Sequence, residues 1–395
     1  MWRTVMLGDV LKTGAGGTPL KSKKEYYEGG SIKWLLSGAV CERDIHDSKT
    51  HISEAGLANS SAKIFPKDTV LVAMYGATAG QVGILRTEAA TNQAVCGIYP
   101  SSDYLPEFLY YYLTNYKETL LLEVSGVAQP NLSQIKIKNI PLPLISLAEQ
   151  QRIVAKLDAA FAEIDRAIEF ATTRLDEGRD ITSAYLEKHF ERELDGDAVS
   201  QMSEGLEKIT YGFTNPMPTS ESGKYLITAK NVINGSIDYD NARFTTLEAF
   251  DNELTDKSKP KVGDVLLTKD GTLGRLAVVD RDDICVNQSV AVLRTNTDLN
   301  PYYLKWQLFS PLFQRKMQKE AGGTTIKHIY ITRVDKMDIS IPQLEEQLYL
   351  VEKTERLDAK VRELLEIRVR QLANLQALKS AILAQELEPP QSEAA

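Results

Sequence analysis

Residues 65–72 read FPKDTVLV and residues 260–267 read PKVGDVLL, and a glycine turn follows each stretch. The first turn reads GATAG at 76–80, and the second reads GTLG at 271–274, one residue shorter. The spacing between the two stretches is about 195 residues, whereas solenoid repeats have units of about 20–50 residues. The pattern therefore predicts a duplicated domain.

The repetition extends well beyond these stretches. Asn92-Gln93 returns as Asn287-Gln288 at an offset of 195, and Glu149-Gln150 returns as Glu346-Gln347 at an offset of 197. A single chain with two copies of one unit suggests a target that itself has two halves.

Composition is that of an ordinary soluble globular protein, with 395 residues, 43% hydrophobic and 25% charged. No apolar run approaches the roughly 18 residues needed to cross a bilayer, and the start has no signal-peptide core. The three cysteines (Cys41, Cys96 and Cys285) and four histidines lack metal-ligand spacing. We expect buried, reduced thiols at Cys96 and Cys285 and a cytoplasmic location.

The net charge of −8 is unevenly distributed. Residues 1–145 and 206–343 each carry a net charge of +1, while the remaining segments, 146–205 and 344–395, together carry −10. Because the repeated parts are close to neutral, a basic nucleic-acid-binding face on them remains compatible with the acidic total.

This partition predicts four regions, at 1–145, 146–205, 206–343 and 344–395. The first and third contain short β-type runs punctuated by glycine and proline, followed by aromatic-rich helical patches that begin at Pro106 and Pro301. We expect these aromatics to lie in the core. The second and fourth regions each contain a long helix, at about 147–190 and 344–388, without an internal proline.

The distal helix carries a heptad pattern, with apolar residues in alternating steps of 4 and 3 from Leu350. A shift of 197 residues gives the same register in the central helix, where smaller side chains replace many leucines. We predict that the two helices pack on each other, small against large. The residues assigned to this packing are Ile153, Leu157, Ile164, Leu350, Leu357, Val361, Leu364, Leu375 and Leu378. The alternative is two separate amphipathic helices, each covering its own domain.

Signatures of catalysis are missing from the sequence. There is no phosphate-binding loop, and Asn215-Pro216-Met217-Pro218 lacks the aromatic residue of an adenine methyltransferase motif. No nucleophile–base pairing recurs in both copies, and Asn92 and Asn287 are expected to cap turns. We expect no catalytic residue, no metal and no cofactor.

The order of motifs, present twice, resembles the specificity subunit of type I restriction–modification systems along nearly the whole chain. The motifs that carry the resemblance in the first copy are LGDV at 7–10, GGTP at 16–19, WLLSG at 34–38, DTVL at 68–71, QPNL at 129–132, IPLP at 140–143 and EQ at 149–150. The second copy has GDVL at 263–266, TIKHI at 325–329, IP at 341–342 and EQ at 346–347. A GGTP equivalent is not evident in residues 206–240, so we expect the two copies to diverge where they would read DNA.

The resemblance implies an α+β fold, in which two similar target-recognition domains are separated by two long antiparallel coiled-coil helices in a pseudo-two-fold, near-circular arrangement. It also implies a non-catalytic subunit whose domains each read one half of a bipartite double-stranded DNA target. The helices would set the spacer length and dock two methyltransferase subunits, and motor-nuclease subunits would join through the complex. No membrane partner is implied.

Residues that would contact DNA are expected on polar, basic or aromatic loops that flank the strands. The candidates are Lys21, Lys23, Lys24, Tyr26, Arg43, Tyr75, Lys224, Lys230, Asn231, Lys269, Arg275 and Lys327. For each of them a solvated surface side chain is the competing interpretation. For the whole chain, the alternatives are a coiled-coil protein scaffold without DNA readout and a fused adenine methyltransferase with an unrecognised site.

Overall fold

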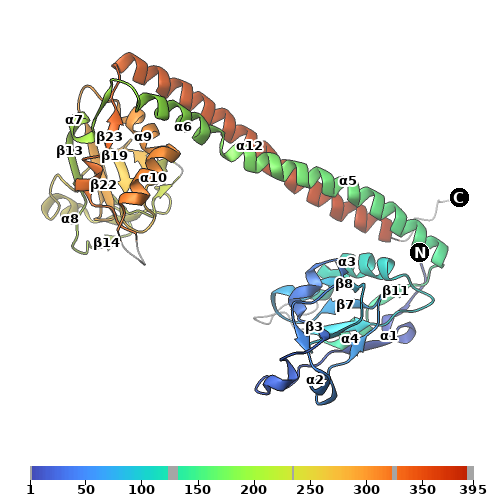
Figure 1. Cartoon of the computed structure of the whole chain (residues 1–395). Coiled ribbons are helices and arrows are strands. Elements are labelled where there is room, and N and C mark those ends of the chain that lie inside the picture. The colour runs from blue at the N-terminus through green and yellow to red at the C-terminus, as the bar shows by residue number, and fades with distance from the viewer. Residues whose placement is uncertain (1, 123–131, 234, 323–326, 389–395) are drawn as a thin grey trace. The chain divides into compact units, whose positions relative to one another are not determined.

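The computed structural model describes residues 2–122, 132–233, 235–322 and 327–388 (Figure 1). It divides into two compact units, which are described separately below: unit 1 contains residues 1–170 and 371–395, and unit 2 contains residues 171–370. Two motif segments from the sequence, Gln129–Asn131 and Thr325–Ile326, lie outside the described residues.

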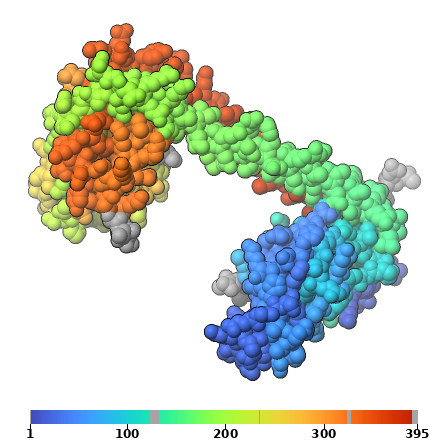
Figure 2. Space-filling view, in the orientation of Figure 1, coloured from blue at the N-terminus to red at the C-terminus, as the bar shows by residue number. Residues whose placement is uncertain are grey.

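Unit 1 contains two sheets and one strand pair among its described residues. In the space-filling view, its residues up to Leu122, coloured blue to cyan, gather into one body (Figure 2). The main sheet has the order β2-β10-β7-β8-β4, with β2 Thr13–Ala15, β4 Asp44–Ile45, β7 Val70–Ala73, β8 Val82–Leu85 and β10 Val95–Ile98. The second sheet has the order β5-β3-β9-β6, with β3 Ile32–Leu35, β5 His51–Ile52, β6 Ile64–Phe65 and β9 Ala89–Thr91. The strand pair joins β1 Thr4–Met6 to β11 Pro141–Pro143.

Unit 2 repeats the central part of this plan, with a four-stranded main sheet in place of the five-stranded one. Its main sheet has the order β13-β22-β19-β20, with β13 Leu206–Tyr211, β19 Val265–Thr268, β20 Leu276–Val278 and β22 Val290–Thr295. Its second sheet has the order β14-β18-β15-β21, with β14 Thr219–Ser220, β15 Lys224–Ile227, β18 Arg243–Thr245 and β21 Ile284–Val286. Two strand pairs complete it: β12 Val199–Gln201 with β23 Asp338–Ser340, and β16 Val232–Ile233 with β17 Ser236–Ile237.

Strand register confirms the duplication residue by residue. Val70 on β7 faces Ile98 on β10, and Val265 on β19 faces Leu293 on β22, so both partners shift by 195. Across the glycine turn the shift becomes 194, because Val70 faces Ile84 while Val265 faces Val278. The missing residue therefore lies in the turn, as the sequence predicts.

The central strands form because their residues suit burial on both faces. All four residues of β7 and all four of β19 are buried, and both runs are rich in valine and leucine. The turns that follow them require glycine, since Gly76 and Gly271 have φ of 73° and 76°.

Short helices cover these sheets. In unit 1 they are α1 Leu7–Val10, α2 Glu54–Ala58, α3 Pro106–Leu122, α4 Gln134–Lys138 and the 3₁₀ turns η1 Lys24–Tyr26, η2 Ser37–Cys41 and η3 Gly76–Thr78. In unit 2 they are α7 Met202–Gly205, α8 Leu247–Asn252, α9 Pro301–Phe309, α10 Pro311–Glu320 and α11 Ile331–Val334. Asn300 caps α9 by accepting hydrogen bonds from the amides of Tyr302 and Tyr303, and Pro301 begins the helix as predicted. Tyr111 in α3 and Tyr303 in α9 are at most 1% exposed and belong to the core as expected, whereas Tyr302 in α9 is 42% exposed, so the expectation was wrong for that residue.

Two long helical segments contribute to both units: α5 Leu147–Arg179 with α6 Ile181–Glu193, and α12 Leu344–Leu387. In unit 1, Lys156 pairs with Glu386 (2.6 Å) and Asp165 pairs with Lys379 (2.6 Å), so the two helices run antiparallel. In unit 2, a Cβ placed on Gly178 would lie 3.0 Å from Leu365, a glycine packed against a leucine. Within each unit the helices pack on each other, as the heptad pattern predicts.

The central helix is interrupted, where the sequence suggested one continuous helix over 147–190. Asp180 lies between α5 and α6 and adopts φ −94° and ψ −8°. Gly178 and Asp180 are both poor helix formers, and glycine is a common cause of kinks, which accounts for the break.

The nine residues assigned to helix packing differ in burial. Ile153, Leu157, Ile164, Leu350 and Val361 are buried, and Leu357 and Leu375 are half-buried. The assignment was wrong for Leu364 and Leu378, which are 38% and 48% exposed. A straight helix drifts about 20° per heptad from a strict 3.5-residue repeat, so the inward position moves by one residue. Leu365 then faces Gly178, and Lys379 then lies 4.7 Å from the Phe161 ring.

Candidate nucleic-acid interface

Each glycine turn lies beside a second chain segment at the same edge of its main sheet. In unit 1 the amide of Leu132 donates to the carbonyl of Met74 (2.9 Å), and in unit 2 the amide of Ile329 donates to the carbonyl of Lys269 (3.0 Å). The pairs are related by offsets of 197 and 195, so both units join their turn to the same incoming segment.

In unit 2 this edge carries a compensated cluster of charges. The Asp270 carboxylate accepts a hydrogen bond from the Lys269 ammonium (2.9 Å) and also pairs with the His328 ring. The Lys269 ammonium further lies 5.3 Å from the centre of the Tyr211 ring. These contacts therefore hold the turn against the segment at His328, and they occupy the Lys269 ammonium so that it is not free to bind a ligand.

In both units a glycine-containing segment passes close to the backbone at the end of a strand, and one backbone hydrogen bond joins the two; we call this place the crossing. The crossing corrects the expectation that copy two lacks a GGTP equivalent. In unit 1 the amide of Gly17 donates to the carbonyl of Thr91 (2.8 Å), and in unit 2 the amide of Phe213 donates to the carbonyl of Val286 (3.1 Å). The residue before each donor is a glycine, because a Cβ would lie 2.3 Å from the Thr91 carbonyl oxygen at Gly16 and 1.8 Å from the Val286 carbonyl oxygen at Gly212.

The two copies thus share this backbone hydrogen bond and the glycine before its donor, while the donor itself is Gly17 in one copy and Phe213 in the other. Gly17 lies so close to Ala62 that a Cβ would come within 2.3 Å of its amide nitrogen, whereas Phe213 carries a full aromatic ring. Phe213 packs beside Met217 against a small apolar cluster that includes Leu226. A single glycine shared by the two copies, Gly16 in one and Gly212 in the other, was too weak a signal to find this crossing in the sequence.

The Asn-Gln pairs follow these crossings. The Asn92 side chain accepts a hydrogen bond from the amide of Ala94 (3.2 Å), and the Asn287 side chain accepts one from the amide of Ser289 (3.2 Å). The prediction that these asparagines cap turns is confirmed.

A groove of about 820 Å³ in unit 2 opens between these features. Its lining combines the apolar side chains of Phe213 and Met217 with the cations Lys230 and Arg243 and with the capping residue Asn287. Lys230 and Arg243 are exposed, and no ion pair engages either one among the residues that the structure describes. Cations beside apolar and amide groups are the combination that contacts phosphates and base edges.

A family model for the type I restriction modification DNA specificity domain matches residues 1–171 and 213–372. The chain belongs to this family. The two matched segments correspond to the two copies found in the sequence and in the strand register.

Curated relatives of the chain are specificity subunits. The chain is 25% identical over 350 residues to the type I restriction enzyme EcoBI specificity subunit of Escherichia coli, covering 80% of this chain and 72% of that protein. It is 26% identical over 162 residues to the EcoR124I/EcoR124II specificity subunit of Escherichia coli, covering 40% of each.

Two solved structures share the fold. One is a chain from work on complex assembly and conformational transition of the type I R-M system, with a TM-score of 0.79, 19% identity and coverage of 99% of this chain and 98% of that one. The other is the HsdS subunit from Thermoanaerobacter tengcongensis, with a TM-score of 0.58, 18% identity and coverage of 98% and 96%. Both support the α+β architecture with two domains.

Most of the basic side chains assigned to DNA contact in this specificity-family chain do lie on the surface. The exposed ones are Lys21, Lys23, Lys24, Lys230, Arg275 and Lys327. Tyr75 is 39% exposed at the start of its glycine turn. Lys224 is half-buried, with its ammonium 5.3 Å from the centre of the Phe250 ring.

Four of the assigned residues do not project from surface loops, so the expectation that their side chains are placed to contact DNA was wrong. Tyr26, Asn231 and Lys269 are 8%, 6% and 7% exposed. The Asn231 side chain accepts hydrogen bonds from the amide and hydroxyl of Thr228 (3.0 and 2.9 Å), so its polar group serves a turn. Arg43 is half-buried and bonded to Asp158 (2.8 Å), so its guanidinium is directed at a helix.

Arg243 is the surface cation that sequence reasoning missed. It begins the strand β18, which at three residues is too short to give a clear strand signal, and it is brought to the groove by pairing between β18 and β15. In the described residues, no group of three or more histidine, cysteine or acidic side chains has the arrangement of a metal site, and no helix has the length and apolarity to cross a membrane.

Proposed function

We propose that this chain reads a bipartite double-stranded DNA target, one half through each copy. The observation that carries the proposal is the paired match of the DNA specificity model to 1–171 and 213–372, with the same backbone crossing in each segment. A repeated backbone frame with different side chains suits two domains that recognise different half-sites.

The groove of unit 2 is the part of this surface that has the chemistry to read DNA. Lys230 and Arg243 would neutralise phosphates or reach base edges, while Phe213 and Met217 supply apolar contact to bases. Lys224, Arg275 and Lys327 would add backbone contacts around it. In unit 1, Lys21, Lys23, Lys24 and Tyr75 are the corresponding surface groups.

The partners follow from the relatives named as subunits of type I enzymes. We assign two methyltransferase subunits to the helices, with motor-nuclease subunits joining through the complex in the cytoplasm. The first residues of the two long helices, Leu147 and Leu344, are 41% and 45% exposed and are related by the offset of 197. The two similar helices therefore offer two equivalent positions for the two assigned subunits. In this assignment the chain itself carries no catalysis and no cofactor.

The test is methylation sequencing of cells that express the chain with its methyltransferase partner. Replacing residues 206–343 with the corresponding domain of a relative should change one half of the methylated sequence and leave the other half and the spacer intact. Adding about four residues near Arg174, roughly one helical turn, should change the spacer instead. A target that keeps both halves after the domain replacement would overturn the proposal.

Two other functions are separated by direct measurements. A protein-only scaffold would show no salt-dependent DNA affinity in the presence of the methyltransferase subunit. A fused methyltransferase would bind S-adenosylmethionine as the purified chain.

A further inference from the structure

A carboxylate occupies the same position on the two long helices. Asp158 lies on α5 and Glu355 on α12, and they are related by the offset of 197 that relates the helices. Each receives a cation from the sheet domain of its own unit: Arg43 in unit 1 and Lys305 in unit 2.

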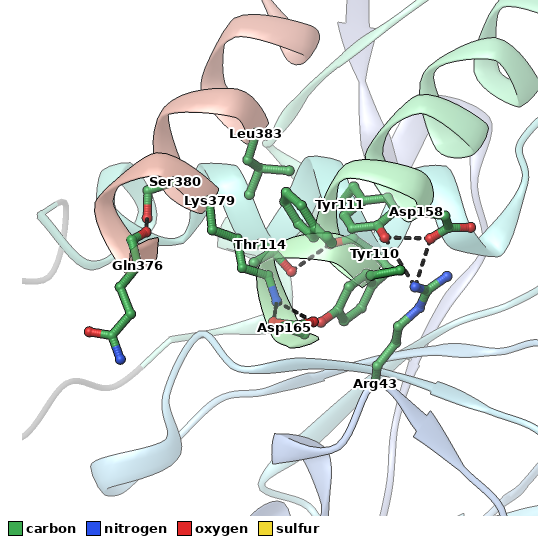
Figure 3. Close-up of a pocket in the computed structure, with 12 residues that line it drawn as sticks. Arg43, Tyr110, Tyr111, Thr114, Asp158, Asp165, Gln376, Lys379, Ser380 and Leu383 are labelled. Atoms are coloured by element: carbon green, nitrogen blue, oxygen red, sulfur yellow. Dashed lines mark hydrogen bonds and ion pairs between the residues drawn. The ribbon is translucent and has the colours of Figure 1, made fainter. Parts of the chain in front are cut away.

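In unit 1 the contact is a closed set of three hydrogen bonds (Figure 3). The Arg43 guanidinium donates from Nη1 to the Asp158 carboxylate (2.8 Å) and to the Tyr111 hydroxyl (3.0 Å). Tyr111 in turn donates to the same Asp158 oxygen. Burial, reinforced by the hydrogen bond to Asp158, raises the pKa of Tyr111, so this hydroxyl keeps its proton and remains a donor.

These bonds reach the main sheet as well as the helix. Arg43 lies directly before β4, and its carbonyl accepts a hydrogen bond from the amide of Ile84 on β8 (2.7 Å). The guanidinium therefore joins the edge of the sheet to α5, and Tyr111 joins α3 to the same carboxylate. A charge-assisted hydrogen bond of this kind resists rotation of one element against another.

In unit 2 the equivalent contact is looser and comes from a helix. The Lys305 ammonium on α9 lies 3.9 Å from the Glu355 carboxylate and 3.9 Å from the centre of the Trp306 ring. Burial lowers the pKa of Lys305, and Glu355 and Asp358 oppose part of that change. No strand takes part in this contact, so Glu355 holds α9 alone.

We propose that Asp158 and Glu355 are positioning residues that fix the angle at which each sheet domain presents its reading loops, with Asp158 the stronger of the two. The inference rests on the proposed reading of one half-site by each copy. Loss of one carboxylate should impair recognition of one half-site and leave the other unchanged.

The experiment uses the full chain in complex with its methyltransferase subunit and DNA in which one half-site at a time carries mismatches. Asp158→Asn should weaken binding about tenfold and reduce discrimination at the half-site of copy one only. Glu355→Gln should affect the other half-site, by a smaller factor. Asp158→Glu, which keeps the carboxylate, should restore most of the affinity.

A double-mutant cycle ties the effect to the pair. The losses of affinity in Arg43→Ala and Asp158→Ala should not add in the double variant, because each single change already removes the bond between the two residues. Asp158→Ala should lose at least as much as Arg43→Ala, since it also removes the bond from Tyr111. The matched control is Arg166→Ala, which removes an exposed ion pair with Glu163 on the same helix and should leave both half-sites unaffected. Equal loss at both half-sites, or additive single effects, would overturn the proposal.

A readout without DNA keeps this proposal separate from the proposed function. Hydrogen exchange of the β4 and β8 amides in the free chain should quicken in Asp158→Asn and not in Arg166→Ala. If it quickens while the wild-type complex binds no DNA, the proposed function fails and the mechanical part of the inference stands. Unchanged exchange in Asp158→Asn overturns the inference even where DNA binding is intact.

Discussion

Gln150 and Gln347 make the same three hydrogen bonds in the two units. The Gln150 carbonyl accepts from the amide of Leu105 (2.9 Å), and its amide group donates to the carbonyls of Asp103 (2.8 Å) and Ile145 (3.2 Å). The Gln347 side chain does the same with the amide of Asn300 (2.8 Å) and the carbonyls of Asp298 (2.8 Å) and Pro342 (2.7 Å). Both side chains are fully buried, so each one fastens the start of a long helix to the loop before an aromatic helix.

Replacing Gln150 with leucine should therefore destabilise unit 1. The change keeps the side chain's approximate size but leaves the backbone amide of Leu105 and the carbonyls of Asp103 and Ile145 without this partner. These groups are only partly buried, so each costs at most about 1–3 kcal/mol, and less where water can reach it. Gln347→Leu should act equally on unit 2. Thermal and denaturant unfolding would measure both, with the exposed neighbour change Gln151→Leu as the control. An unfolding midpoint for Gln150→Leu equal to that of Gln151→Leu would contradict this.

Gly212→Ala should prevent correct folding of unit 2. The added Cβ would lie 1.8 Å from the Val286 carbonyl oxygen, which is backbone and cannot move aside cheaply. Gly322→Ala is the control, because nothing lies within 4 Å of a Cβ there. Circular dichroism and limited proteolysis should show a loss of ordered unit 2 for Gly212→Ala alone, and a fully folded Gly212→Ala protein would count against the crossing.

Asp264→Ala should be strongly destabilising. The Asp264 carboxylate is 2% exposed and accepts two hydrogen bonds from Arg294 (both 2.8 Å) and one from the amide of Lys261 (2.8 Å). Removing one partner of a buried pair costs about 3–5 kcal/mol, and the 20% exposure of Arg294 places the loss toward the lower end of that range. Urea unfolding would measure it, with the exposed Asp282→Ala expected to change stability by no more than about 0.5 kcal/mol.

The cysteines should differ in reactivity. Burial raises the pKa of both Cys96 and Cys285 to about 12, while Cys41 is exposed. A thiol reagent at neutral pH should modify one cysteine in the native protein and all three after denaturation. Three rapidly reacting thiols in the native protein would disprove the predicted burial.

The same two thiols give a pH dependence of stability. In the unfolded chain they ionise near their ordinary pKa of about 8.5, whereas the folded protein holds them neutral up to about 12. Their contribution to stability is therefore fully present below about pH 8.5 and is lost as pH rises from there toward 12. The double variant Cys96→Ser/Cys285→Ser should lose that part of the alkaline slope in urea titrations at several pH values.

Arg275 offers a direct test of base reading. If its exposed guanidinium contacts a guanine, Arg275→Ala should cost about 1–3 kcal/mol in binding and relax specificity at one position of one half-site. Binding of a panel of single-base variants would measure this. Uniform weakening across the panel would instead make Arg275 a phosphate contact.

Local patterns with a short range predicted much of this fold. The valine and leucine runs of β7 and β19, the turns at Gly76 and Gly271 and the caps at Asn92 and Asn287 depend on neighbouring residues, so the sequence indicates them directly. The heptad pattern likewise predicted the helix pairing, and it was inaccurate at Leu364 and Leu378 because small rotations accumulate along a long helix.

The candidate interface was harder to predict because burial and pairing depend on residues distant in sequence. Asn231 is polar and lies in a loop, yet its side chain accepts a hydrogen bond from the Thr228 amide. Arg43 is paired with an aspartate 115 residues away in the sequence. Arg243 reaches the groove only through strand pairing. Residue type alone does not distinguish a polar side chain that is free on the surface from one that is paired within the fold.

The crossing at Gly16 and Gly212 has a consequence for how such a chain can evolve. One residue of the crossing must remain glycine, while the next is glycine in one copy and phenylalanine in the other. Substitutions at the first position are lost because the protein no longer folds. Substitutions at the second position are limited only by the space that the neighbouring residues leave. A substitution at Phe213 can therefore alter the lining of the groove in unit 2 without altering the crossing, whereas the backbone at Ala62 restricts the equivalent position in unit 1 to Gly17.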